Sequence, residues 1–385
     1  MRFIRRRFLV FPAMFCVIVV AGYVVAEVPL LGVDKGKRHP IGLTRTVGRE
    51  PAMVSCRLGE SHRMLNEYQE AFADYTRAIE QDPKCYDAYT GRAMIWQVPG
   101  DEKRALADIG IVIRAIPDRV FSYKVRNSIY VALRKYDLAL IDLEKALKIN
   151  PIFSCGLHDR GTVYSRLGRE KEATADFDQA IKTAPAASCG YEARAAYRLT
   201  RGLMDGASED IEKAISTGAG FPDGYLLRVV LNEDKRKIDE AIVDAETAIR
   251  LAPKAADGYA ARARLRFLRG QRLDALKDMD KAVTLLPGNV RNLVARGIIR
   301  TGCGKRELGR ADIEAAKLRD SGLADDYLRE GKRAMAIQRD LPAFWFFKAY
   351  LLMAGKSGSP EVVSQVAALE NKLGLTLSNS AGSRL

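Results

Sequence analysis

The feature that most constrains this chain is a proline that recurs at intervals of 34 residues. Proline ends a helix because it cannot continue the backbone hydrogen bonding and because it restricts the residue before it. Counting back from each proline divides residues 52–323 into eight units, each long enough for two helices and a turn. The series lacks its proline at Ala219 and resumes afterwards. Its members are Pro83, Pro117, Pro151, Pro185, Pro253 and Pro287.

Each unit also repeats small and large residues at fixed positions. Position 20 is alanine in seven units and Gly309 in the eighth, and position 27 is alanine in every unit except for Val112. Small residues at these positions let two helices approach closely. Position 4 is tyrosine or leucine in seven units, which fills the space between neighbouring helix pairs. The pattern predicts helical hairpins that stack in register.

This 34-residue pattern resembles the tetratricopeptide repeat family, which has the aromatic, the two small residues and the terminal proline at these spacings. The resemblance covers residues 52–323, about 70% of the chain. It implies an all-α fold, a right-handed α-solenoid of helix-turn-helix repeats. Residues 324–377 are then expected to form an extra helix and a degenerate ninth repeat at 342–375 that caps the array, followed by a disordered tail at 378–385.

Five aromatic residues are crowded into this predicted cap, too close together to share one helix face. We expect some of them to pack against the eighth repeat and others to be covered by the final helix, because the end of a solenoid needs closing. The alternative is that they form a docking patch. They are Phe344, Trp345, Phe346, Phe347 and Tyr350.

The family resemblance also implies a binding surface. In the family, positions 2, 5, 9 and 12 of each first helix line a concave groove that binds proteins or peptides. In this sequence the lining is polar in the early repeats and apolar in the later ones, which suits an extended or helical peptide. The implied partner-binding residues are Thr90, Met94, Lys124, Ser128, His158, Thr162, Glu192, Leu226 and Val230.

The same groove positions bring together candidate metal ligands. Cys155 and His158 occupy positions 2 and 5 of the fourth repeat, and Cys189 and Glu192 occupy them in the fifth. Thiolate and imidazole ligands together suit zinc or copper, so a metal or small-ligand carrier is the rival function. The simpler interpretation is four ordinary groove residues. Neighbouring helices are expected roughly 9–10 Å apart, which is wide for a shared ion and too wide for a Cys155–Cys189 disulfide.

Charged residues recur as regularly as the prolines. Position 23 is aspartate in all eight units, and position 7 is arginine in units two to eight. Because the two helices of a hairpin are antiparallel, these positions lie at one level, and each aspartate is expected between two arginines in a structural ladder. The alternative is a basic track for an acidic ligand. The ladder residues are Asp108, Arg126, Asp142, Arg160, Asp176, Arg194, Asp210, Arg228, Asp244, Arg262, Asp278 and Arg296.

The N-terminus has the pattern of an export segment. Four arginines within the first seven residues precede Phe8–Ala26, which carries no charge and ends in small residues. Residues 1–28 are therefore predicted to be a secretory signal peptide or an uncleaved membrane anchor, with the remainder in the periplasm. Residues 29–51, rich in proline, glycine and basic residues, are predicted to be a linker.

Charge and motifs exclude some other functions. The net charge is +14, but the first 50 residues hold nine Lys/Arg against three Asp/Glu, and the charges of the remainder are interspersed. We therefore expect no nucleic-acid partner. The sequence contains no Gly-rich phosphate loop, HExxH or GxSxG motif, so neither enzyme activity nor a cofactor is expected.

Overall fold

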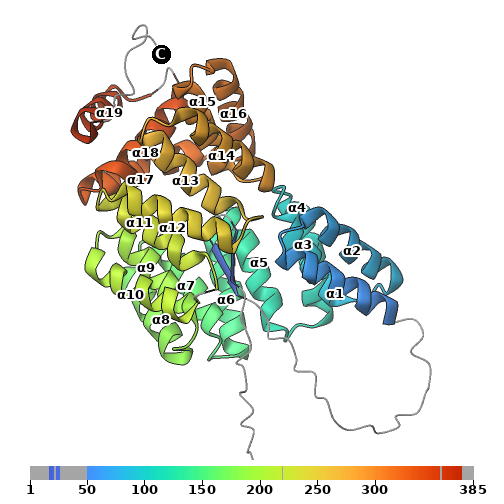
Figure 1. Ribbon diagram of the computed structural model, residues 1–385. Coiled ribbons are helices and arrows are strands. Elements are labelled where there is room, and N and C mark those ends of the chain that lie inside the picture. Colours follow the sequence, from blue (N-terminus) through green and yellow to red (C-terminus); the bar gives the residue numbers. More distant parts are fainter. Residues whose placement is uncertain (1–16, 21–22, 27–49, 219, 356–357, 375–385) are drawn as a thin grey trace, which may run out of the picture.

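The computed structural model describes residues 17–20, 23–26, 50–218, 220–355 and 358–374, and Figure 1 shows an array of helical hairpins. The helices α1–α16 pair consecutively into eight hairpins with the expected period, which confirms the all-α repeat solenoid. The first helices of the hairpins are α1 (Glu50–Met64), α3 (Tyr86–Trp96), α5 (Val120–Ala132), α7 (Ser154–Arg166), α9 (Ser188–Thr200), α11 (Asp223–Asp234), α13 (Ala256–Leu268) and α15 (Val290–Gly302).

The first helices also contact one another along the array, so they form its inner layer, and the second helices form its outer layer. The second helices are α2 (Tyr68–Gln81), α4 (Glu102–Ala115), α6 (Tyr136–Ile149), α8 (Glu170–Thr183), α10 (Met204–Thr217), α12 (Ile238–Leu251), α14 (Arg272–Leu285) and α16 (Arg306–Arg319). Three further helices follow: α17 (Leu323–Ala336), α18 (Asp340–Ala354) and α19 (Pro360–Leu373).

Within a hairpin, a small residue at position 8 packs against a large one at position 24. A methyl group added to Gly161 would lie 2.8 Å from the ring of Phe177, and one added to Gly297 would lie 2.9 Å from Ile313. In the α11–α12 hairpin the sizes are reversed: the larger Val229 occupies position 8 and the smaller Ala245 occupies position 24. Both are fully buried in one cluster. The helices therefore pack closely because the volumes at the two positions are complementary.

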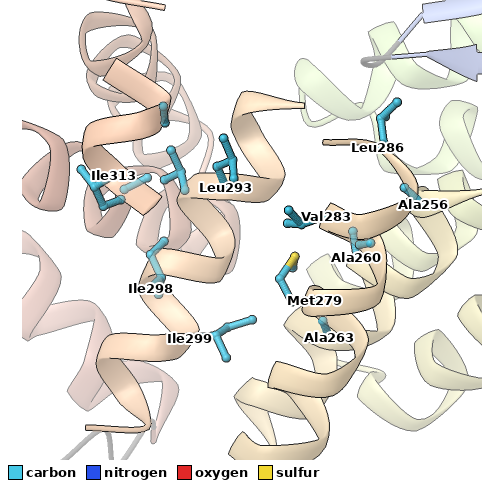
Figure 2. Packing of buried hydrophobic residues seen from close by; sticks show 14 of the residues in the cluster. Ala256, Ala260, Ala263, Met279, Val283, Leu286, Leu293, Ile298, Ile299 and Ile313 are labelled. Atoms are coloured by element: carbon cyan, nitrogen blue, oxygen red, sulfur yellow. The ribbon is translucent and has the colours of Figure 1, made fainter. Parts of the chain in front are cut away.

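Between successive hairpins, apolar side chains from both layers interdigitate. Figure 2 shows the largest of these clusters, in which Met279 and Val283 of α14 lie between α13 and the side chains of α15. Ile299 and Met279 have no exposed surface. Burial of this kind stabilises a solenoid through contacts between neighbouring repeats.

The array curves far enough for its early repeats to touch its late ones. Arg134, just after α5, forms ion pairs of 2.8 Å with Asp320 and 2.6 Å with Asp326. Val98 belongs to the same buried cluster as residues of α13–α16, and any side chain at Gly288 would collide with the Val98 carbonyl oxygen. The eight repeats thus complete one turn that closes on itself.

The C-terminal helices pair differently from the prediction. The hairpin forms between α17 and α18, so the ninth repeat is not at 342–375 but begins near residue 324. Gly331 and Phe347 occupy its positions 8 and 24 and make the same close contact as in earlier repeats. Pro342 does not end a helix but lies in the first turn of α18, where no hydrogen-bonding N–H is needed.

This ninth hairpin is also turned inwards. α18 contacts α15 and α16 and reaches across the array to α11, while Leu323 and Tyr327 of α17 also pack against the cluster of repeats seven and eight. Phe344 and Phe347 are fully buried in a cluster with α19, whereas Trp345, Phe346 and Tyr350 also pack against the cluster of repeats seven and eight. The aromatic residues are thus divided between the eighth repeat and the final helix.

Near the N-terminus, β1 (Val17–Val20) and β2 (Tyr23–Ala26) form an antiparallel pair, and β2 contacts α9. The rest of the predicted export segment, nearly all of the predicted linker and the predicted tail at 378–385 lie outside the described residues. Within the described ranges, no helix has both the length and the apolar character needed to cross a bilayer.

Candidate functional site

The predicted groove residues all lie on first helices, but the closed turn buries them unequally. Met94, Ser128, Thr162, Leu226 and Val230 keep part of their surface exposed. The more deeply buried ones are polar: Thr90, Lys124, His158 and Glu192 expose 4% or less.

The early, polar part of this surface is largely satisfied by internal bonds. Thr90 and Thr162 each donate to a backbone carbonyl one turn earlier in their own helices. The Ser128 hydroxyl donates to Gln97 at 3.0 Å, and Lys124 forms an ion pair with Asp159 at 3.6 Å. These groups position the helices, which leaves the later repeats as the more available surface.

The later repeats enclose an apolar pocket of about 420 Å³. Val230 of α11 and Ile298 of α15 line one side, as expected for groove positions. The opposite side is formed by Trp345 and Phe346 of α18, which folds back over the inner layer. A pocket of this size, lined mainly by apolar side chains, is typical of a binding site.

Charged side chains surround this pocket, and most of them are paired. Glu233 faces Arg264 at 3.5 Å, and Arg339 bonds Asp234 at 2.7 Å. Arg291 differs: its guanidinium lies 5.9 Å from the Tyr327 ring, and no carboxylate pairs with it among the described residues. An arginine without an anionic partner beside an apolar pocket favours a ligand that carries an acidic group.

Arg291 is a pocket residue that sequence reasoning missed, whereas Trp345 and Phe346 belong to the aromatic residues for which a docking patch was the alternative. Arg291 occupies position 2 of the eighth repeat, a groove position, so its place in the repeat could have indicated it. The position of Trp345 depends on the inward turn of the ninth hairpin, for which the sequence has no comparable signal.

The candidate metal ligands lie closer together than the helix spacing predicts. One ligand atom each from Cys155, His158 and Cys189 lies within 4.8 Å of the other two. We call these three residues the Cys–His cluster. The helix spacing, which was expected to be wide for a shared ion, therefore does not keep these ligand atoms apart. The reason is that α7 and α9 contact each other directly, and side chains from both helices extend into the gap.

Buried polar groups surround the Cys–His cluster. The His158 ring places Nδ1 3.3 Å from Asp159, while its Nε2 is buried and has no hydrogen-bond partner within the described chain. Burial alone would lower the pKa of His158, but the Asp159 carboxylate and Cys155 together outweigh burial and raise the pKa. Glu192 also has a buried carboxylate oxygen with no partner there, and burial raises its pKa to about 6.

The ladder residues pair within each repeat. The guanidinium of Arg126 bonds both carboxylate oxygens of Asp142 at 2.8 and 2.6 Å, and the same bidentate contact recurs in repeats two to eight. The aspartates are at least nine-tenths buried, so this geometry satisfies charges that water cannot reach. The remaining pairs are Arg92–Asp108, Arg160–Asp176, Arg194–Asp210, Arg228–Asp244, Arg262–Asp278 and Arg296–Asp312.

The contact to the neighbouring repeat differs from the predicted alternation. Arg194 reaches back to Asp178, and Arg228 reaches back to Glu212. These acceptors occupy position 25 of the preceding repeat, two residues beyond its position-23 aspartate. Five of the eight position-23 aspartates instead bond position 11 of their own repeat, through Arg198, Arg266 and Arg300, Asn232 and, in the first repeat, His62.

Comparison with known proteins supports the repeat assignment. Models of the tetratricopeptide repeat match residues 52–85, 128–153 and 156–186. Human Tetratricopeptide repeat protein 6 is 29% identical over 106 residues, which are 27% of this chain and 20% of that protein. Human DnaJ homolog subfamily C member 3 is 31% identical over 94 residues, 24% of this chain and 19% of that protein. The chain thus spans about a fifth of the length of these relatives.

A solved structure shares the fold. The APC/C hetero-tetramer Cut9–Hcn1 is similar with a TM-score of 0.50 and 13% identity, over 68% of this chain and 52% of that chain. The chain contains tetratricopeptide repeats and folds as an all-α helical solenoid. Such repeats typically mediate protein–protein interaction and are generally not enzymatic.

Proposed function

We propose that this chain is a non-enzymatic scaffold that binds a segment of another protein on its inner surface, in the pocket between α11, α15 and α18. The observation that carries this proposal is the apolar pocket of about 420 Å³ with Val230 on one side and Trp345 on the other. Apolar pockets that are lined by aromatic side chains hold the anchor residues of protein partners.

The occupant that fits is an acidic peptide with one or two large apolar side chains. The apolar walls of the pocket can pack against the side chains of the peptide. The guanidinium of Arg291, which has no ion pair within the described residues, can donate hydrogen bonds to a carboxylate of the peptide. Ser128 and Lys124 of the third repeat are already bonded to Gln97 and Asp159, which favours partner binding at the later repeats.

Site-specific photo-crosslinking in cells tests the location of this site. A photoreactive amino acid replaces Val230, inside the pocket, or Ile141, which is 60% exposed on the outer helix α6. We expect discrete protein adducts from position 230 and none of the same mass from position 141. Identical adducts from both positions, or none from position 230, would contradict the proposal.

We also propose that the scaffold works outside the cytoplasm, carried there by its N-terminal signal or anchor. Four arginines before the uncharged stretch Phe8–Ala26 support this proposal. Alkaline phosphatase fused after Leu385 is then expected to be active, because it folds only after translocation. An inactive phosphatase fusion, together with an active cytoplasmic reporter fused at the same position, would contradict the export proposal. This result would not bear on the proposed binding site.

A further inference from the structure

We propose that the Cys–His cluster is a binding site for a thiophilic divalent metal ion, with Zn²⁺ as the ion that its donors suit best. This site is separate from the apolar pocket, and it does not depend on the proposed partner-binding function.

The geometry of the donors is the first argument. Two thiols and an imidazole from α7 and α9 already lie within 4.8 Å of one another without an ion. In a tetrahedral zinc site with ligand distances of about 2.0–2.3 Å, the ligand atoms lie roughly 3.3–3.8 Å apart. Side-chain rotations that move the ligand atoms by about 1 Å are therefore enough to bring them to the distances of a zinc site, and the helices need not move.

An unsatisfied polar atom is the second argument. The Nε2 atom of His158 is buried and has no hydrogen-bond partner in the part of the chain that is described. Such an atom costs stability unless it finds a partner. A bound ion would accept an electron pair from this nitrogen and so satisfy it.

The surroundings of the histidine are the third argument. Asp159 lies 3.3 Å from Nδ1 of His158, on the side of the ring opposite the unpartnered Nε2. This arrangement of carboxylate and imidazole orients histidines that bind zinc through the other nitrogen. Lys124, 3.6 Å from Asp159, places a positive charge close to the thiolates.

The cluster is also accessible to an ion. Cys155 retains part of its surface exposed, which gives an ion a path to the three ligand atoms.

Cobalt titration of the full chain, purified with a reducing agent and freed of metal, tests the site. Co²⁺ bound tetrahedrally by thiolates gives visible absorption bands and a thiolate charge-transfer band in the near ultraviolet. We expect one Co²⁺ per chain with these bands, displaced by one equivalent of Zn²⁺. We expect Cys189→Ser and His158→Gln to weaken binding at least about tenfold.

A thiol outside the cluster provides the matched control. Cys303→Ser removes a partly buried cysteine from the eighth repeat and should leave the cobalt spectrum unchanged. Zn²⁺ should raise the melting temperature of the wild type and of Cys303→Ser, but not that of Cys189→Ser, because a ligand stabilises only the state that binds it. Absence of the spectrum from the wild type, or its persistence in Cys189→Ser, overturns the proposal.

Discussion

At the residue scale, the most regular feature is a buried carboxylate held by a partly exposed guanidinium. Asp142 exposes 2% of its side chain and Arg126 exposes 26% of its own. Burial raises the pKa of Asp142, and the bidentate Arg126 opposes this effect. The matched charges within each repeat make a structural role more consistent with the contacts than a basic track for a ligand.

The number of cations around each aspartate predicts how much the free energy of unfolding falls when an arginine is replaced. Asp142 faces Arg126 and no second arginine, whereas Asp210 also accepts a bond from Arg198 at 2.8 Å. We expect Arg126→Leu to lower the free energy of unfolding by about 3–5 kcal/mol, because it strands a buried carboxylate. Arg194→Leu should cost roughly half as much. Urea denaturation followed by circular dichroism measures both.

Arg310, exposed on α16 and without an ion pair among the described residues, supplies the control for this comparison. Arg310→Leu should change stability by less than about 0.5 kcal/mol. Unchanged stability in both ladder variants, together with loss of the partner adducts, would show that the arginines form the binding site instead.

Asp257 predicts a dependence of stability on pH. Burial raises its pKa to about 6, although Arg264 opposes this, whereas an unfolded aspartate titrates near about 3.9. The folded state therefore binds the proton more tightly, and stability falls as the pH rises from 4 to 6. Asp257→Asn should be more stable than the wild type by about 3 kcal/mol at pH 7 and equally stable at pH 4. The exposed Asp274→Asn should show no such difference.

The arginine–aspartate pairing could be predicted because both residues recur at fixed positions in repeats two to eight and antiparallel helices bring them to one level. The second acceptor, at position 25, could not be predicted from spacing. It depends on the rotation of α8 relative to α9, which decides that Arg194 meets Asp178 and not Asp176.

At the element scale, the distinctive feature is the ninth hairpin, whose second helix faces inwards. The predicted ninth repeat at 342–375 begins at Pro342 and therefore pairs α18 with α19, whereas the hairpin forms between α17 and α18. The pair Gly331 and Phe347 gives the correct register, because it repeats the small-to-large contact of Gly161 and Phe177. The inward turn itself depends on contacts of α18 with α11, which no local pattern encodes.

Packing of this hairpin predicts a large effect from one truncation. Phe347 of α18 has no exposed surface and packs against residues of α17 and α19. Phe347→Ala should lower the free energy of unfolding by about 3–5 kcal/mol, because it leaves a cavity. Val363→Ala, on the exposed face of α19, should cost less than about 0.5 kcal/mol. A Phe347→Ala protein that melts like the wild type but loses its adducts would favour the docking-patch alternative.

At the scale of the whole molecule, the array closes on itself where residues about 190 apart in sequence meet. Gly288 and Gly220 both occupy position 33 of a repeat, where other repeats carry Lys84, Asp118 and Ile152. The turn therefore tolerates a side chain. Gly288 nevertheless has no room for one because the Val98 carbonyl lies against it, whereas Gly220 faces open space.

Two glycine variants test this closure. Gly288→Asp should open the ring and raise the radius of gyration measured by small-angle X-ray scattering. Gly220→Asp, at the same repeat position, should leave the radius unchanged. Equal radii for both variants and the wild type would show that the early and late repeats do not meet in solution. The sequence predicted the repeats but not this contact, because it follows from small rotations summed over eight units.

The central claim is that a partner binds in the apolar pocket and that its acidic group is held by Arg291. The most direct measurement is the yield of the Val230 photo-crosslink in chains that carry Arg291→Glu or Arg310→Glu, two exposed arginines that form no ion pair in the described parts of the chain. We predict that Arg291→Glu removes most of the adduct, because it repels the partner's carboxylate, and that Arg310→Glu leaves it intact. An equal yield from both variants would contradict the account.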